Sequence, residues 1–311
     1  MAAHATQRPL ASSLRRLVAA TVGGCFRYRV TGLAAEAAFF AILSLPPLVF
    51  GLAGTVGYIT SALGDTTVEQ LRDQVLSLAG QLLAPQGVSE VIEPTVDDVL
   101  AGGRADVISL GFVLALWSGS RALNVFVDTI TIMYGLGGRR GVVKTRALSF
   151  GLYVVALVVG IVVLPLVVAG PRFVRAVLPP ELSGLQALYW PVVILLSVAF
   201  LTTLYHLSVP VRTSWLRDLP GAALAFVAWI AGSFALRWVL SAVTGGTSIY
   251  GPLAAPIAVL VWLYLVSIAV LIGAALNAAV DQVWPHADGP RAEQTHSHAR
   301  ENPVTPVRSA P

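Results

Sequence analysis

The segment from Trp117 to Asp128 carries a guanidinium, an amide and a carboxylate within a run that is otherwise apolar. These groups belong to Arg121, Asn124 and Asp128. A guanidinium can hold an anion, and a carboxylate can take up a proton or a cation, so this set could serve substrate binding or ion coupling. A charged side chain at the centre of a bilayer costs at least about 2.5–3.5 kcal/mol on insertion scales. The three residues therefore need partners, water or a function.

An α-helix would gather the polar side chains of this segment on one face. The face comprises Ser118, Arg121, Asn124, Asp128 and Thr131. Arg121 and Asp128 would lie about 10 Å apart along the helix axis, which strains a direct ion pair. Asn124 or water is expected to bridge them, and Glu36 is another potential partner for Arg121.

Three interpretations of this face stay open. It could contact a substrate or ion, it could be a structural cluster that fixes helix packing, or Asp128 could lie near the cytoplasmic surface of the membrane. The candidate substrate- or ion-binding residues are Arg121, Asn124, Asp128, Glu36 and Ser118. Two secondary candidates are Asn277, which could hydrogen-bond across helices, and Arg237, which could snorkel to the interface.

The chain as a whole has the composition of an integral membrane protein. Of its 311 residues, 56% are hydrophobic and only 12% are charged, whereas soluble domains have about 25% charged residues. One soluble core could not bury so much apolar surface. The single cysteine, Cys25, excludes an internal disulfide and a cysteine-based metal cluster.

Six stretches are long enough to cross the hydrocarbon core, which takes about 20 apolar residues in a helix. They are continuously apolar rather than alternating, which favours helices over strands. The predicted spans are residues 33–59, 107–135, 147–169, 188–209, 219–243 and 252–280. The sequence thus predicts an all-α, polytopic bundle of six transmembrane helices, with residues 33–280 as the transmembrane domain.

Lysine and arginine are concentrated on one side of this topology. Most of the 20 basic residues fall before the first span, between the second and third, after the fourth, and in the C-terminal tail. The positive-inside rule places such segments in the cytoplasm. We therefore predict a multi-pass protein of the bacterial inner (plasma) membrane with both termini cytoplasmic. The net charge of +4 then reflects topology and does not indicate nucleic acid.

Three segments lie outside the membrane in this prediction. Residues 1–32 are expected to form a basic, amphipathic cytoplasmic lead-in rather than a cleaved signal peptide. Residues 60–106 combine apolar residues at helical spacing with many acids, which predicts an external helical segment. That segment could be a cap on the bundle, or a gate or cation-attracting vestibule. Residues 281–311 are expected to be a disordered cytoplasmic tail.

Three motifs together resemble the YihY/BrkB family of bacterial inner-membrane proteins. Six spans, cytoplasmic termini and a long first external loop also match that family. The motifs are Glu36-Ala-Ala-Phe39-Phe40 to Pro46-Pro47, then Trp117-Ser-Gly-Ser-Arg121 with Asn124, and Tyr250-Gly251 with Gly273-Ala-Ala-Leu-Asn277. The resemblance covers residues 15–283. One position departs from it, because the family has a glutamate where this chain has Ala275.

The resemblance implies an envelope protein with proposed roles in export and serum resistance, and it brings an older label, ribonuclease BN. A nuclease needs convergent acids or histidines for metal binding or acid–base catalysis. Four of the five histidines lie in the terminal segments, so the sequence does not support that activity. If the missing glutamate matters to the family, Ala275 means that this chain lacks the role or has moved it.

Two functional hypotheses follow. The first is a transporter or exporter that moves a small or lipidic, anionic compound through a polar cavity lined by the second span. The second is an envelope- or lipid-handling protein without ion-coupled transport. We expect no catalytic residue, metal, cofactor or nucleic-acid partner. The expected partners are membrane lipids and an unidentified small-molecule or lipid substrate, and homo-oligomer formation is left open.

Overall fold

The computed structural model describes residues 10–45, 105–177, 189–211, 214–243 and 254–284, together with residues 72, 73, 76, 89, 93, 94 and 97. No strand occurs among these residues. The elements are α1 (Leu10–Arg27), a helix over Val30–Leu45, α6 (Ala105–Met133), α7 (Val142–Val177), α8 (Tyr189–Ser208), the short 3₁₀ helix η3 (Trp215–Arg217), α9 (Leu219–Val243) and α10 (Ala254–Val283). The predicted all-α class is confirmed.

Five of these helices are long and apolar enough to cross a membrane. The qualifying stretches are Leu110–Met133, Val142–Val159, Trp190–Ser208, Leu219–Ser241 and Pro256–Val283. A further candidate span consists of Ser13–Arg27 and Val30–Leu45, which meet at 60°. The protein is therefore a polytopic membrane helix bundle, with five continuous spans and one bent pair in the described part of the chain.

The bend lies directly before the first predicted span. Arg29 has a φ of 51°, in the left-handed region that ends many helices. The amide of Gly32 then donates to the carbonyl of Arg29 at 2.9 Å, within the first turn of the next helix. The predicted span at residues 33–59 is helical as far as residue 45, and residues 46–59 lie outside the described residues.

α7 extends beyond the predicted span of residues 147–169 at both ends. Hydropathy marks only the part of a helix that suits lipid, whereas backbone hydrogen bonding continues through polar residues such as Lys144 and Thr145. The other four continuous spans begin and end within about three residues of their predicted bounds, the usual uncertainty for helix ends.

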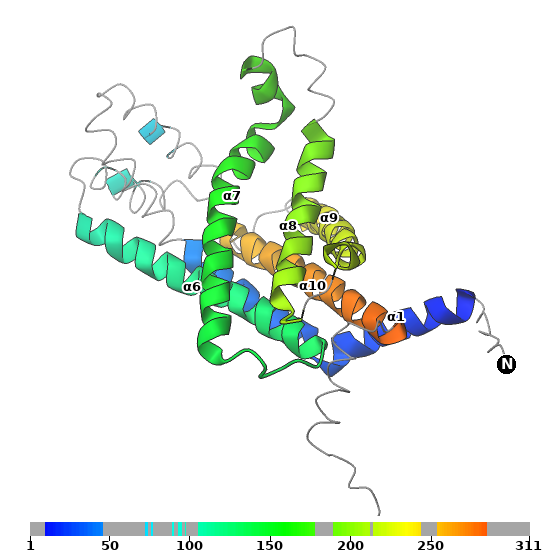
Figure 1. Cartoon of the computed structure of the whole chain (residues 1–311). Helices are drawn as coiled ribbons and strands as arrows, with labels where there is room; N and C mark the ends of the chain where they lie inside the picture. Colours follow the sequence, from blue (N-terminus) through cyan, green and yellow to red (C-terminus); the bar gives the residue numbers. More distant parts are fainter. Residues whose placement is uncertain are drawn as a thin grey trace, which may run out of the picture.

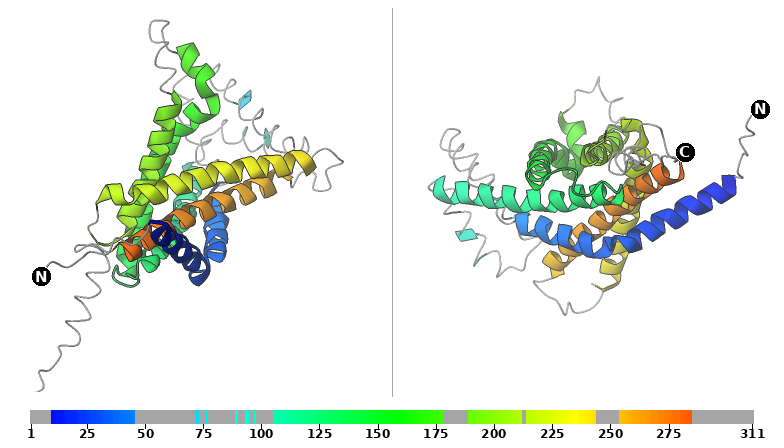
Figure 2. Two further views of the ribbon diagram at one scale, coloured as in Figure 1. Left: turned by 90° about the vertical axis from the view of Figure 1, so that its right-hand side faces the viewer. Right: turned by 60° about the horizontal axis from the view of Figure 1, so that its bottom comes forward.

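α9 and α10 form the most extensive helix pair, followed by α6 with α7 and α1 with α10. Figure 1 shows α7 crossing α6 and α8 crossing α10, and Figure 2 shows α9 running alongside α10. A Cβ added to Gly221 would overlap the carbonyl oxygen of Gly273, and the reverse also holds. The two backbones can approach so closely because both residues lack a side chain.

The buried core lies where α6, α8 and α10 meet. Ile130, Tyr205 and Leu271 have the deepest large side chains, one from each of these helices. Other large apolar side chains face outward, including Leu195 at 69% exposure and Phe234 at 68%. Lipid solvates such surfaces without the penalty that water imposes, so the outward apolar surface agrees with placement in a membrane.

The predicted external segment, residues 60–106, falls mostly outside the described residues. Arg72 is described, and its guanidinium donates to Asp97 at 2.6 Å and to Glu93 at 2.8 Å. The guanidinium lowers the pKa of Asp97 below its ordinary value, mainly through this hydrogen bond. Arg72 thus links two regions of the segment. Most of the lead-in forms α1, and the tail after residue 284 lies outside the described residues.

Candidate functional site

The polar face predicted on α6 is only partly assembled as one cluster. The side-chain amide of Asn124 donates to Asp128 Oδ2 at 2.8 Å, one turn further along the helix. The hydroxyl of Ser149, on α7, donates to Asn124 Oδ1 at 3.4 Å. Asn124 therefore connects Asp128 to the neighbouring helix, while the carboxylate itself is exposed.

Arg121 does not join this group. Its guanidinium lies over the ring of Phe40, 5.4 Å from the ring centroid, in a cation–π contact with the helix Val30–Leu45. Glu36 lies on the same helix and is exposed, but the two charges form no ion pair. The cation of the polar face and its carboxylate thus contact different neighbours, and they form no ion pair with each other.

Ser118 and Thr131 face the bundle. Ser118 is buried and donates to the carbonyl of Leu114 in its own helix at 2.7 Å. Thr131 donates to the carbonyl of Val127 at 2.7 Å and to that of Ser208 at 2.9 Å. Ser118 is therefore satisfied within α6, whereas Thr131 ties α6 to the last residue of α8.

A second polar centre surrounds Asp218, between η3 and α9. Its side chain is 4% exposed. Its Oδ2 lies 3.4 Å from His206 Nδ1 on α8, and its Oδ1 accepts a hydrogen bond from the hydroxyl of Tyr134 at 3.4 Å. Neither His206 Nδ1 nor Asp218 Oδ2 has a hydrogen-bond partner in the described part of the chain. The arrangement gathers an acid, an imidazole and a phenol from three different parts of the chain.

Asn277 holds this centre against α10. Its side-chain amide donates to the carbonyl of Asp218 at 2.9 Å, and its Oδ1 accepts from the amide of Gly221 at 2.8 Å. The amide therefore satisfies two backbone groups at the start of α9, where helix N–H groups lack partners in their own helix. The prediction that Asn277 hydrogen-bonds across helices is confirmed.

Burial controls the ionisation of this centre. It raises the pKa of Asp218 to about 6, against the opposing attraction of His206 and the hydrogen bond from Tyr134. Burial, together with the nearby carboxylate of Asp218, holds the pKa of Tyr134 well above its ordinary value. The carboxyl group of Asp218 can therefore gain or lose a proton near pH 6, whereas the phenol of Tyr134 stays neutral at that pH.

The end of α8 beside this centre is capped by Arg140. Its Nη1 donates to the carbonyls of Leu207 and Ser208, at 2.9 Å and 3.3 Å. A cation near the last carbonyls of a helix is favourable because the helix dipole is negative there. The loop between α6 and α7, which contains Arg140, is thereby bonded to the C-terminal end of α8.

The sequence interpretation missed Asp218. The residue directly precedes α9, where an aspartate is a common N-terminal residue of a helix, so nothing local distinguishes it from a solvent-exposed acid. Arg237 was named, but it is exposed on α9, and among the described residues no hydrogen bond or ion pair joins it to the polar face of α6 or to Asp218. Among the described residues, no group of three or more His, Cys, Asp or Glu side chains could hold a metal ion.

Comparison with known proteins gives two matches. A family model described as Virulence factor BrkB matches residues 24–298, a range that includes the α6 face, Asp218 and Asn277. A Bacillus subtilis (strain 168) protein named ribonuclease-like protein YfkH is 25% identical over 252 residues, covering 78% of this chain and 87% of that relative. No solved structure matches the chain.

Proposed function

This chain belongs to the family described as Virulence factor BrkB, and on that premise we propose that it is an exporter-like protein that moves a small or lipidic, anionic compound along the polar face of α6. We further propose that it resides in the bacterial inner membrane with both termini in the cytoplasm. The proposal assigns it no catalytic residue and no cofactor.

The exposure of Arg121 and Asp128 carries this proposal. Both residues lie in the span Leu110–Met133, and both are exposed rather than neutralised by each other. An exposed charge within a span is expensive in lipid, so such residues usually face water or a transported ion or molecule. A purely structural cluster would instead satisfy its charges internally, as Asp218 and His206 do in part.

The two charges are suited to different tasks. The guanidinium of Arg121 is held by an aromatic ring and keeps its N–H donors for an anionic group. Among the described residues, Asp128 accepts a hydrogen bond from Asn124 on one oxygen, and its other oxygen has acceptor capacity for a proton or a cation. We assign anion contact to Arg121 and ion coupling to Asp128.

Metabolite and lipid profiling of a deletion strain tests the proposal. A compound that accumulates in the deletion should disappear on complementation with wild type and should persist with Arg121→Ala or Asp128→Asn. Arg217→Ala is the matched control, because it removes an exposed arginine that lies outside the candidate spans. If both α6 variants insert normally and restore the wild-type profile, the assignment fails.

A second function is favoured by the ion pairs that Arg72 forms with Glu93 and Asp97 in the 60–106 segment. In this alternative the segment engages lipid headgroups or envelope partners, and the chain transports nothing. Deleting the segment while the bundle stays folded should then abolish function more completely than any substitution on α6. The reverse order of severity favours transport.

The name of the Bacillus relative suggests a third candidate function, cleavage of RNA, which purified protein can test. Purified protein is incubated with labelled RNA and Mg²⁺ or Mn²⁺. We expect no cleavage above that of a mock purification. Metal-dependent cleavage that a substitution within a span removes would replace the transport proposal with an enzymatic one.

A further inference from the structure

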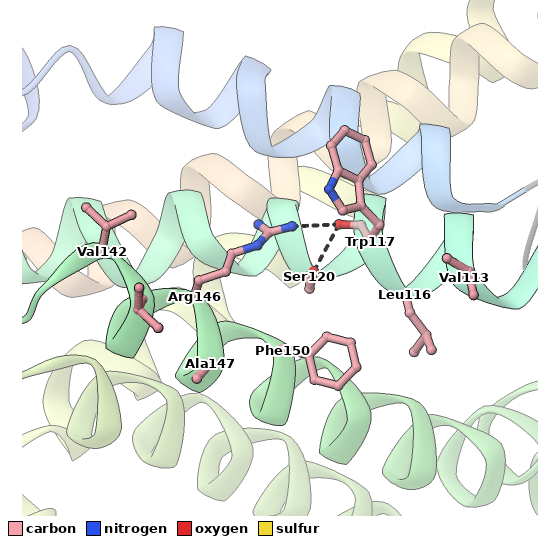
Figure 3. Close-up of a pocket in the computed structure, with 9 residues that line it drawn as sticks. Val113, Leu116, Trp117, Ser120, Val142, Arg146, Ala147 and Phe150 are labelled. Atoms are coloured by element: carbon pink, nitrogen blue, oxygen red, sulfur yellow. Dashed lines mark hydrogen bonds between the residues drawn. The ribbon is translucent and has the colours of Figure 1, made fainter.

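An apolar groove of about 760 Å³ runs between α6 and α7. Figure 3 shows its walls, with Val113, Leu116 and Trp117 from α6 and Val142, Ala147 and Phe150 from α7. The groove is open along one side rather than enclosed. Its walls belong to two stretches that qualify as membrane spans, so the medium outside it is lipid.

Arg146 is the charged residue of this groove. Its Nη2 donates to the carbonyl oxygen of Trp117 at 3.2 Å, and that oxygen also accepts from the hydroxyl of Ser120 at 2.9 Å. Its Nη1 is buried and has no acceptor among the described residues. A guanidinium has five N–H donors, and an unsatisfied buried donor on a charged group is costly. The groove therefore contains a cation with unused hydrogen-bonding capacity.

The groove has the chemistry of a lipid site rather than that of a soluble ligand. No residue lining it is acidic, so nothing in its wall competes with an anion for Arg146 or attracts the amine of a zwitterionic headgroup. Arg146 also follows Arg139 and Arg140 closely in the sequence, and basic residues beside a span attract anionic lipid. Trp117, 55% exposed, can cover an acyl chain with its ring.

We propose that this groove binds one anionic phospholipid, whose phosphate accepts hydrogen bonds from Arg146 and whose acyl chain lies against Leu116, Trp117 and Phe150. A small rotation of the Arg146 side chain would bring Nη1 to the phosphate in a bidentate contact, the geometry that arginine favours. The site does not depend on transport, because the lipid could equally be a permanent component of the fold.

Lipid titration of the purified full-length protein tests the site. Native mass spectrometry compares phosphatidylglycerol with phosphatidylcholine of the same acyl chains. Both lipids offer a phosphate to Arg146, but only phosphatidylcholine brings a quaternary ammonium, which the guanidinium repels and no acidic residue lining the groove attracts. Wild type should therefore bind the anionic lipid about tenfold more tightly, which corresponds to about 1.4 kcal/mol. Arg146→Gln should lower that preference to near unity, and Arg146→Lys should keep part of it.

Two further variants separate charge from shape. Lys144→Gln removes a neighbouring exposed cation that does not line the groove, and it should leave the preference unchanged. Ala147→Phe fills the groove without changing charge, and it should weaken the binding of both lipids. If Arg146→Gln does not fold, Ala147→Phe decides alone, because unchanged lipid binding in that variant overturns the site.

Three other results would also overturn the proposal. The first is an anionic preference that survives Arg146→Gln. The second is equal competition by glycerol phosphate, which would mean a phosphate site that needs no acyl chain. The third is a second copy of this chain bound at the groove, seen as a dimer that Ala147→Phe dissociates while lipid stoichiometry stays constant.

Discussion

Asp128 and Asp218 are both carboxylates beside apolar helices, but their surroundings give them different properties. Asp128 is exposed and bonded to Asn124. Asp218 is enclosed by residues from α8, α10 and the turn after α6, and burial raises its pKa to about 6. Position in the sequence does not separate the two, because the difference lies in which helices close around each side chain.

Asp218 should make the stability of the bundle depend on pH. The folded protein holds the Asp218 proton more tightly than the unfolded chain, where an aspartate has a pKa of about 3.9. The stabilising contribution is therefore complete below that value and is lost as pH rises through about 6. Thermal unfolding in detergent from pH 4 to pH 8 should show this loss in wild type as a fall of a few degrees.

The asparagine variant is the control for that measurement. Asp218→Asn cannot ionise, so its unfolding temperature should fall less over the same range, whatever its absolute value. His206→Gln should keep a pH-dependent loss, because Asp218 remains. Parallel curves for wild type and Asp218→Asn would show that Asp218 does not titrate in this range.

Asn277 and Asp218 mark the limit of residue-level prediction. Asn277 was identifiable because an amide among alanines in a span must find a polar partner, and it does hydrogen-bond to another helix, α9. Its partner was not identifiable, since the pairing depends on how α9 meets α10. The absence of a pair between Arg121 and Glu36 has the same origin, because the bend at Arg29 sets where Glu36 lies.

At the scale of helices, hydropathy predicted the ends of a helix correctly where a loop follows the apolar stretch. It did not predict them where the helix continues through polar residues. The bounds of α8 and α9 were nearly those predicted, but α7 was predicted too short. The bend between α1 and the helix Val30–Leu45 could not be predicted, because it depends on Arg29 adopting a left-handed conformation that is uncommon outside glycine.

The α9–α10 contact should be sensitive to single methyl groups. Gly221→Ala places a Cβ against the carbonyl of Gly273 and the amide of Asn277, so the helices must separate and the Asn277 hydrogen bonds must weaken. We expect a lower unfolding temperature and a lower yield of monodisperse protein in size-exclusion chromatography. Gly273→Ala should behave similarly.

A glycine elsewhere in the same helix is the control. At Gly232 the nearest atom to an added Cβ would be Leu265 Cβ at 3.6 Å, an ordinary contact. Gly232→Ala should be neutral or stabilising, because alanine is the better helix former by about 1 kcal/mol. Equal losses at Gly221 and Gly232 would show that the close approach of the α9 and α10 backbones is not what makes Gly221 sensitive to substitution.

At the scale of the whole molecule, the length of the apolar stretches was enough to predict the fold class and most of the spans. Which loops face the cytoplasm is predicted from the positive-inside rule. The single cysteine makes that rule testable. After Cys25→Ser, a cysteine is introduced at Gly141, which is exposed directly before α7, or at Trp284, which is 45% exposed. Both should react with a membrane-impermeant maleimide in inverted vesicles and be protected in intact spheroplasts. Labelling of either position in intact spheroplasts would contradict the predicted cytoplasmic location of that position.

The hydroxyl of Tyr205, which donates to the carbonyl of Val270 at 2.7 Å, has a mechanical consequence. α8 is bonded to α10 at this point. The C-terminal end of α8 is bonded to α6 by Thr131 and to the loop between α6 and α7 by Arg140. A force that displaces α8 would therefore be transmitted to the middle of α10, close to Gly273.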